Sequence, residues 1–337
     1  SIHCVYEQAE REYAAGEAQC AELATTAAAA IFPPDPQTAV LVNCLSHPWH
    51  GAFVLPEEWA DAGVADAAGN PLPAQAENGR TVVLLDLPGA NFATIRRHGR
   101  ATPAAPPPNA AMVLENDLIR YTFADNGELL GAFDKEANRE ALADDACGNR
   151  LSLYVDRPTQ WDAWDIDQTY EDEWLEDARA VSKPEFLPGG AVRQGLRFRL
   201  AIGESRLEQT VFLTAGTKRL DFVTTADWVE RHRMLRVSFP VAVAANEASF
   251  EIQYGYVRRP THRNTSWDMA RFEVAAQRYA DLSAPDYGVA LLNNCKYGHK
   301  VLGNVLDLNL LRASTHPDPI ADRGHHEFTY ALLPHCG

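Results

Sequence analysis

The feature that most constrains the fold is a long succession of short runs of β-forming residues separated by turn residues. They begin after Pro36 and recur to the end of the chain, a texture typical of all-β sandwiches. The runs lie at 40–45, 52–55, 81–87, 118–123, 129–133, 196–201, 207–213, 220–224, 234–243, 250–257, 288–292, 305–311 and 326–332. About a dozen strands in the last two thirds of the chain predict a large antiparallel sandwich of two sheets.

Turn residues support the antiparallel pairing. Asn126-Gly127 separates two of the runs, and this dipeptide adopts the positive φ angles of a tight hairpin turn. Ala215-Gly216 stands between two further runs. We therefore expect hairpins at both places.

A helix precedes the strands. Its apolar or small residues are spaced alternately by three and four, at Tyr6, Ala9, Tyr13, Gly16, Cys20, Leu23, Ala27 and Ala30. That spacing is typical of a helix-bundle seam, and the prolines at 33, 34 and 36 end it. No second segment with helical period follows. We therefore expect the seam to pack on another subunit or on residues upstream of Ser1, and we favour truncation.

A proline-rich stretch, Ala101 to Asn109, is expected to be an extended linker. It suggests a domain boundary near residue 100. The predicted parts are a helical segment at 1–33, a small β domain at 34–100 and a large sandwich at 101–337.

Charge and cysteine content limit the partners and the compartment. The chain of 337 residues carries a formal net charge of -16, which repels phosphate backbones and anionic membrane surfaces. We therefore expect neither nucleic acid nor membrane as a partner, and no apolar run approaches the length of a membrane span. The six cysteines are scattered without C-x-x-C spacing, so we expect free thiols in a reducing cytoplasm.

The segment 160–167 crowds two tryptophans and three acids together. Indole rings offer faces on which a pyranose stacks, and carboxylates accept hydrogen bonds from its hydroxyls. Its candidate sugar-contact residues are Trp161, Asp162, Trp164 and Asp165. The alternative is that both tryptophans are core residues of the sandwich and the acids form a solvated loop.

A second cluster spans 254–268, which we expect to be a loop leaving a strand. Its candidates are Arg258, Arg259, Arg263, Asn264 and Trp267. The arginines have the geometry to fork onto acids such as Asp162 or Asp165. The alternative is a surface loop held by salt bridges.

A third cluster, 312–327, contains Arg312 and the possible metal ligands His316, Asp318, His325 and His326. The spacing matches no zinc signature, and adjacent histidines on a strand point to opposite faces. We therefore interpret it as a solvent loop and expect no metal site in this chain. Asp162 and Asp165 as paired catalytic acids remain an alternative, although any acid-rich loop offers such a pair.

Three long motifs in order carry a resemblance that covers essentially the whole chain. They are Asp156-Arg157-Pro158 with the segment 161–167, the segment Arg258 to Asp268, and Phe328-Thr329-Tyr330-Ala331-Leu332. The chain resembles the α-mannosidases of glycoside hydrolase family 38, in their cytosolic and bacterial branch. Ser1 to Glu7 is similar to the family segment that follows the catalytic domain.

The resemblance implies that this chain is a C-terminal fragment. It implies the tail of a helical bundle, a small β domain and a large β-supersandwich of galactose-mutarotase type. An N-terminal catalytic domain of the parent enzyme would carry the zinc ion, the aspartate nucleophile and the acid. No residue here matches them, so we expect no catalytic residue and no activity in the fragment alone.

The parent enzyme is expected to hydrolyse terminal α-mannosyl linkages with retention. The expected partners are an α-mannoside or mannose-containing oligosaccharide and the missing catalytic domain; the exposed helix seam also suits a second copy. The candidates above, with Arg312, would shape the substrate rim or dock the catalytic domain. The alternative function is a free-standing carbohydrate-binding or structural sandwich.

Overall fold

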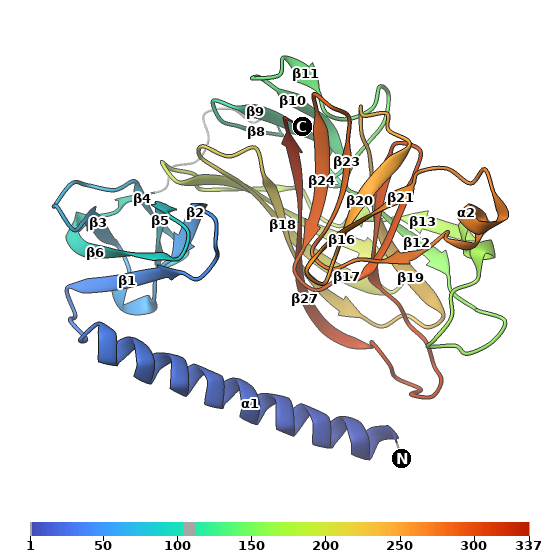
Figure 1. Ribbon diagram of the computed structural model, residues 1–337, viewed down its shortest axis with the longest axis horizontal. Helices are drawn as coiled ribbons and strands as arrows, with labels where there is room; N and C mark the ends of the chain where they lie inside the picture. The colour runs from blue at the N-terminus through green and yellow to red at the C-terminus, as the bar shows by residue number, and fades with distance from the viewer. Residues whose placement is uncertain (1, 104–111, 337) are drawn as a thin grey trace. The chain divides into compact units, whose positions relative to one another are not determined.

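The computed structural model describes residues 2–103 and 112–336 (Figure 1). By its internal contacts the chain divides into two units. The first comprises Ser1–Ala104 with Gly190–Val192, and the second comprises Ala105–Gly189 with Arg193–Gly337. Most of the linker expected at 101–109 lies outside the described residues. Its first residues form the edge strand β7 (Thr102–Pro103), where a proline costs no ladder hydrogen bond.

The helix α1 (Ile2–Ile31) confirms the predicted N-terminal helix. It ends where predicted, with the N–H of Phe32 donating to the carbonyl of Ala28 at 2.7 Å before the prolines begin. None of its described residues is buried, and Tyr13 and Leu23 of the seam are 73% and 67% exposed. The seam therefore has no partner within the described part of this chain.

The rest of the first unit is a small pair of sheets. The strands are β1 (Thr38–Asn43), β2 (Trp49–Val54), β3 (Ala62–Asp66), β4 (Ala74–Glu77), β5 (Arg80–Leu87), β6 (Asn91–Arg100) and β7, with the 3-10 turn η1 (Glu57–Trp59). Among the described residues they pair in the orders β1-β6-β3 and β2-β5-β4-β7. Leu55, Trp59, Val83 and Ile95 are buried between them.

The second unit is built on two large sheets. In the described residues a ten-stranded sheet has the order β14-β16-β17-β18-β27-β24-β23-β20-β21, with β15 beside β16. Its strands are β14 (Arg179–Ala180), β15 (Glu185–Leu187), β16 (Arg193–Ile202), β17 (Ser205–Thr214), β18 (Leu220–Trp228), β20 (Glu247–Ile252), β21 (Gly255–Pro260), β23 (Tyr279–Ser283), β24 (Gly288–Asn293) and β27 (Gly324–His335). The long β27 pairs with β18 on one side and β24 on the other.

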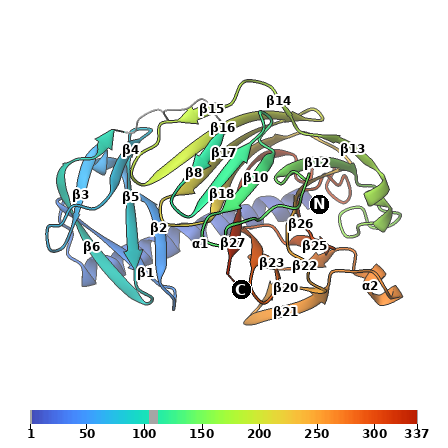
Figure 2. The ribbon, with the colours of Figure 1, turned by 90° about the horizontal axis from the view of Figure 1, so that it is seen from above.

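A six-stranded sheet of the described residues has the order β13-β12-β19-β26-β25-β22. Its strands are β12 (Arg150–Val155), β13 (Trp174–Asp177), β19 (Arg233–Pro240), β22 (Val274–Ala275), β25 (Gly298–Leu302) and β26 (Val305–Leu311). A smaller sheet contains β8 (Val113–Glu115), β9 (Ile119–Phe123), β10 (Leu129–Asp134) and β11 (Arg139–Glu140). The short elements η2 (Gln168–Asp172) and α2 (Ser266–Ala270) complete the unit, and α2 lies just beyond the end of β21 in both ribbon views (Figure 2).

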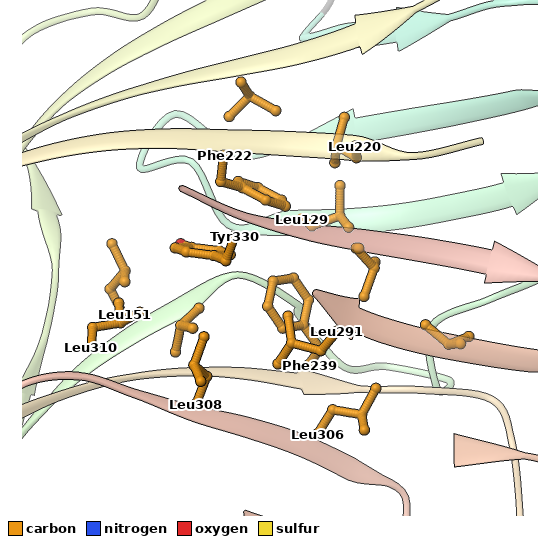
Figure 3. Packing of buried hydrophobic residues seen from close by; sticks show 14 of the residues in the cluster. Leu129, Leu151, Leu220, Phe222, Phe239, Leu291, Leu306, Leu308, Leu310 and Tyr330 are labelled. Atoms are coloured by element: carbon orange, nitrogen blue, oxygen red, sulfur yellow. The ribbon is translucent and has the colours of Figure 1, made fainter. Parts of the chain in front are cut away.

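The core of this unit lies between the two large sheets (Figure 3). Phe222 of β18 stacks on Tyr330 of β27 with 5.0 Å between ring centroids, and Phe239 of β19 packs against both from the other sheet. The hydroxyl of the buried Tyr330 donates to Asn149 Oδ1 at 2.6 Å. This bond satisfies a polar atom that would otherwise be costly to bury.

The mainly β fold with a single long helix is the predicted fold class, and the described residues confirm it. The Asn126-Gly127 hairpin is also confirmed: β9 and β10 pair antiparallel, and Gly127 has φ +82°. The prediction of one strand over 250–257 is wrong. The chain turns at Tyr254, where φ is +65°, and this turn separates β20 from β21.

Neither helix in the described residues is both long and apolar enough to cross a lipid bilayer.

Candidate functional site

The predicted Trp/Asp segment lies in a loop that leaves β12 and leads to η2. Arg312, the residue after β26, anchors this loop. Its guanidinium donates to both carboxylate oxygens of Asp156, with Nε–Oδ2 at 2.7 Å and Nη2–Oδ1 at 2.9 Å. The same Nη2 donates to the carbonyls of Asp165 at 2.7 Å and Asp162 at 3.2 Å. One arginine thus fixes the start and the middle of the loop.

Asp162 forms a second anchor. Its Oδ2 accepts from the N–H of Thr315 at 2.6 Å and of His316 at 3.0 Å, and its Oδ1 lies 3.3 Å from Nδ1 of His232. Burial alone would raise the pKa of Asp162, but these N–H groups and His232 bring it below its ordinary value. The carboxylate is therefore ionised and committed to holding the loop. These contacts tie the Asp162 carboxylate to the backbone at 315–316.

The buried carboxyl of Asp156 behaves differently. It is 2% exposed, and its burial raises the pKa of Asp156 even though Arg312 acts to lower it. The pair is thus a desolvated ion pair in which each partner depends on the other.

Trp161 and Trp164 are exposed on this anchored loop, at 71% and 85%. The alternative that they are core residues is therefore wrong. The N–H groups of Trp164 and Asp165 both donate to the carbonyl of Trp161. Trp161 itself has φ +59°, so the loop makes a tight turn at this residue. The side chain of Asp165, which follows Trp164 in the chain, is exposed and has no hydrogen-bond or ion-pair partner among the described residues.

The second motif is only partly a loop. Arg258 and Arg259 lie on β21, whereas Arg263 lies in the connection to α2. The expected fork of these arginines onto Asp162 or Asp165 is wrong: Arg263 forks onto Glu171 of η2, with 2.6 and 2.7 Å bonds.

The rest of the motif forms the exposed helix α2. Thr265 and Asp268 cap it reciprocally, since the side chain of each accepts from the backbone N–H of the other. Asn264 is exposed at its start, and Trp267 on the helix is 75% exposed.

A buried ionic cluster that the sequence did not predict includes Tyr170 of η2. Arg236 of β19 is 1% exposed; its Nε donates to Asp307 at 2.6 Å and its Nη2 lies 2.8 Å from Glu273. The hydroxyl of Tyr170 donates to Glu273 at 2.7 Å, and Lys300 Nζ donates to that hydroxyl at 2.9 Å. The available signal was a charged residue inside each of two apolar runs, 234–243 and 305–311.

The cluster also affects the pKa of a buried histidine. Burial and the nearby charge of Arg236 lower the pKa of His299 to about 4, so this ring is neutral at physiological pH. Burial raises the pKa of Glu273 above its ordinary value, although Arg236 opposes this.

The third cluster does not assemble a metal centre. His325 Nδ1 lies 2.8 Å from Asp227 Oδ1, and His326 Nε2 lies 2.6 Å from the carbonyl of Asp322. Across residues 2–103 and 112–336 no group of three or more His, Cys, Asp or Glu side chains is placed to hold a metal ion.

Comparison with known proteins places the second unit in a family. Residues 114–320 match the Glycosyl hydrolases family 38 C-terminal domain. Alpha-mannosidase 2C1 of Mus musculus is 38% identical over 330 residues, which cover 94% of this chain and 30% of that protein. Alpha-mannosidase G of Dictyostelium discoideum is 37% identical over 268 residues, covering 77% and 24%. The chain thus spans under a third of the length of these curated relatives.

The fold agrees with solved structures. An alpha-mannosidase from Enterococcus faecalis V583 superposes with a TM-score of 0.66 at 16% identity, covering 90% of this chain and 43% of the other. A further Enterococcus faecalis protein of glycosyl hydrolase family 38 gives a TM-score of 0.68, also at 16% identity, covering 90% and 45%. The chain therefore belongs to glycosyl hydrolase family 38 and carries the C-terminal domain of that family.

Proposed function

We propose that this chain is the C-terminal region of a retaining α-mannosidase that hydrolyses terminal α-mannosyl linkages. The proposal rests on the match to the family's C-terminal domain and on relatives that are named alpha-mannosidases. Because the chain covers about 30% of the first of these relatives, we assign the bond-breaking chemistry to a catalytic region outside this sequence. The chain alone is expected to be inactive.

The parent enzyme's zinc ion belongs with that catalytic region in this proposal. The donor groups in the described residues do not fit it: Asp156 and Asp162 are engaged by Arg312 and by backbone N–H groups, and no three ligands converge.

We assign the loop 156–168 the task of docking the catalytic region. One observation carries this assignment: two indoles are exposed on a loop that Arg312 and Asp162 hold in place. Rigid exposed tryptophans bury large apolar area at little cost in conformational entropy, as at interface hot spots. The exposed Trp267 of α2 is a further candidate for this docking.

Direct contact with the sugar is the second candidate role of the loop. It is favoured by the carboxylate of Asp165, which is exposed next to Trp164 and has no partner in the described residues. An indole face with an adjacent free acceptor is a common arrangement for pyranose binding. In that case the loop would form part of the rim of the mannose site.

Two experiments test these proposals. The purified 337-residue chain should fold and should not turn over an aryl α-mannoside with added zinc or cobalt; metal-dependent turnover would contradict the assignment of chemistry elsewhere. In the full-length parent enzyme, docking predicts that W164A lowers the melting temperature, whereas sugar contact predicts a higher KM at unchanged stability. W174A, which removes a 55% exposed indole on β13, is the matched control.

Three further proposals accompany this function. We propose a helical-bundle tail at 1–33, a small β domain at 34–100 and a supersandwich at 101–337 as the domains. We propose a cytoplasmic location, in line with cysteines that form no disulfide among the described residues. We also propose that the exposed seam of α1 permits self-association when its bundle partners are absent.

A further inference from the structure

A small cleft, with an internal volume of about 20 Å³, opens to solvent beside α2, between β21 and β25. Its walls include Arg259, His262, Arg263, Arg271 and Lys300, with Asp268 as the acid. All of these residues belong to the second unit. The loop 156–168 contributes no residue to this cleft.

The cleft is positively charged in a chain whose net charge is -16. Arg263 and Lys300 both contact Glu171, with Lys300 Nζ at 3.1 Å. The lining has four cationic side chains, Arg259, Arg263, Arg271 and Lys300, and one carboxylate, Asp268. Glu171, which does not line the cleft, pairs with Arg263 and Lys300. The general composition of the protein therefore does not account for this patch.

Arg259 is the cation that lacks a counter-ion. Its guanidinium stacks over Phe250 at 4.8 Å from the ring centroid, and its buried Nη1 has no hydrogen-bond partner among the described residues. Burial and the neighbouring charge of Arg271 lower the pKa of Arg259. A partly buried cation held beside another cation is unfavourable unless an anion joins them.

The guanidinium of Arg271 is available to bind the same anion as Arg259. Its Nη1 lies 3.9 Å from Asp268 Oδ1, too long for a hydrogen bond, and its side chain is 55% exposed. Asp268 is already occupied as the reciprocal cap of α2, since its Oδ2 accepts from Thr265 Oγ1 at 2.7 Å. A second guanidinium is therefore available at the mouth of the cleft.

We infer that this cleft binds a phosphate group between the guanidinium groups of Arg259 and Arg271. Each guanidinium offers a planar fork of N–H donors that matches two phosphate oxygens. A phosphate also supplies the negative charge that this cationic lining favours. The group is either free inorganic phosphate or the phosphate ester of a sugar, and both present the same oxygens.

The test is calorimetric titration of the 337-residue chain at pH 7.5 and constant ionic strength set with chloride. The titrants are inorganic phosphate, a hexose 6-phosphate and the unphosphorylated hexose. Saturable binding of a phosphate is expected, and R259Q and R271Q should each weaken it by about tenfold, the loss of a charge-assisted bond. R179Q is the matched control, since Arg179 lies on β14 at the opposite end of the sheet from β21.

The outcomes distinguish inorganic phosphate from a sugar phosphate ester as the ligand, and they can contradict the proposed binding site. Tighter binding of the ester identifies a phosphorylated sugar, and tighter binding of phosphate identifies the free anion. The inference is overturned if no phosphate binds above the chloride background, if the plain hexose binds equally well, or if R271Q binds like R179Q. Arg271 is largely exposed, so its variant keeps the test valid even where R259Q unfolds. The readout is binding alone, so the result does not depend on the proposed mannosidase function.

Discussion

Replacing Arg312 by alanine should destabilise the second unit and release the loop 156–168. The change removes two bonds to Asp156 and two to backbone carbonyls of the loop. Breaking a buried ion pair by removing one partner costs about 3–5 kcal/mol. Because the Arg312 side chain is 18% exposed, we expect about 3 kcal/mol at pH 7, the low end of that range.

The cost should depend on pH in a defined direction. Burial already raises the pKa of Asp156 in the folded protein above its ordinary value of 3.8, and Arg312 opposes that rise. Removing Arg312 therefore raises the pKa of Asp156 in the folded protein further above its pKa in the unfolded chain. Such a group favours folding when protonated and disfavours it as pH rises, so the variant's deficit should be largest at pH 7 and shrink as pH falls toward 4.

The assay is urea denaturation at several pH values, with hydrogen exchange of the loop amides as the local readout. The double variant D156N/R312A removes both charges and should recover part of the loss at pH 7. R312K is the matched control that keeps the charge without the fork. A deficit under about 0.5 kcal/mol at pH 7, the level of an ordinary surface substitution, or one independent of pH, would refute the reasoning.

Three further predictions concern other parts of the second unit. G127A should cost about 1–2 kcal/mol in urea denaturation, because alanine is strained at φ +82° and its Cβ would lie 3.2 Å from Phe198. His299, with its pKa lowered to about 4, should contribute stability that is lost as pH falls from about 6.5 toward 4, and H299Q should flatten that part of the acid-unfolding curve. The 3.0 Å hydrogen bond that His335 Nε2 donates to Asp281 Oδ1 raises the pKa of His335. The stability it gives is present below pH about 6.5 and lost as pH rises through the raised value; D281N should lower that pKa in an NMR titration.

Local patterns predicted the framework well. The Asn126-Gly127 turn, the proline stop after α1 and most apolar strands depend on a few neighbouring residues, so they can be read from short windows of sequence. The prediction of a single strand over 250–257 was wrong. Its β-formers Phe250, Ile252, Tyr254 and Tyr256 alternate with other residues as in one strand. Gly255 was the turn signal within the run, next to Tyr254 with its left-handed conformation.

The site could be predicted in part. Composition identified Trp161 and Trp164 as notable, but exposure is decided by contacts that anchor the loop from far away in the chain. Arg312 reaches Asp156 across 156 positions of sequence, and Arg263 reaches Glu171 across 92. Such pairings follow from the sheet topology, which the spacing of charged residues does not encode.

The position of β27 in the ten-stranded sheet has a consequence for synthesis. The strands from β14 to β18 and those from β20 to β24 are joined in that sheet by β27 alone, within the described residues. Residues 324–335 must therefore leave the ribosome before the two halves can pair. Until then β18 and β24 each present an unpaired edge to other nascent chains, so a chaperone bound during translation should protect this protein most until β27 is made.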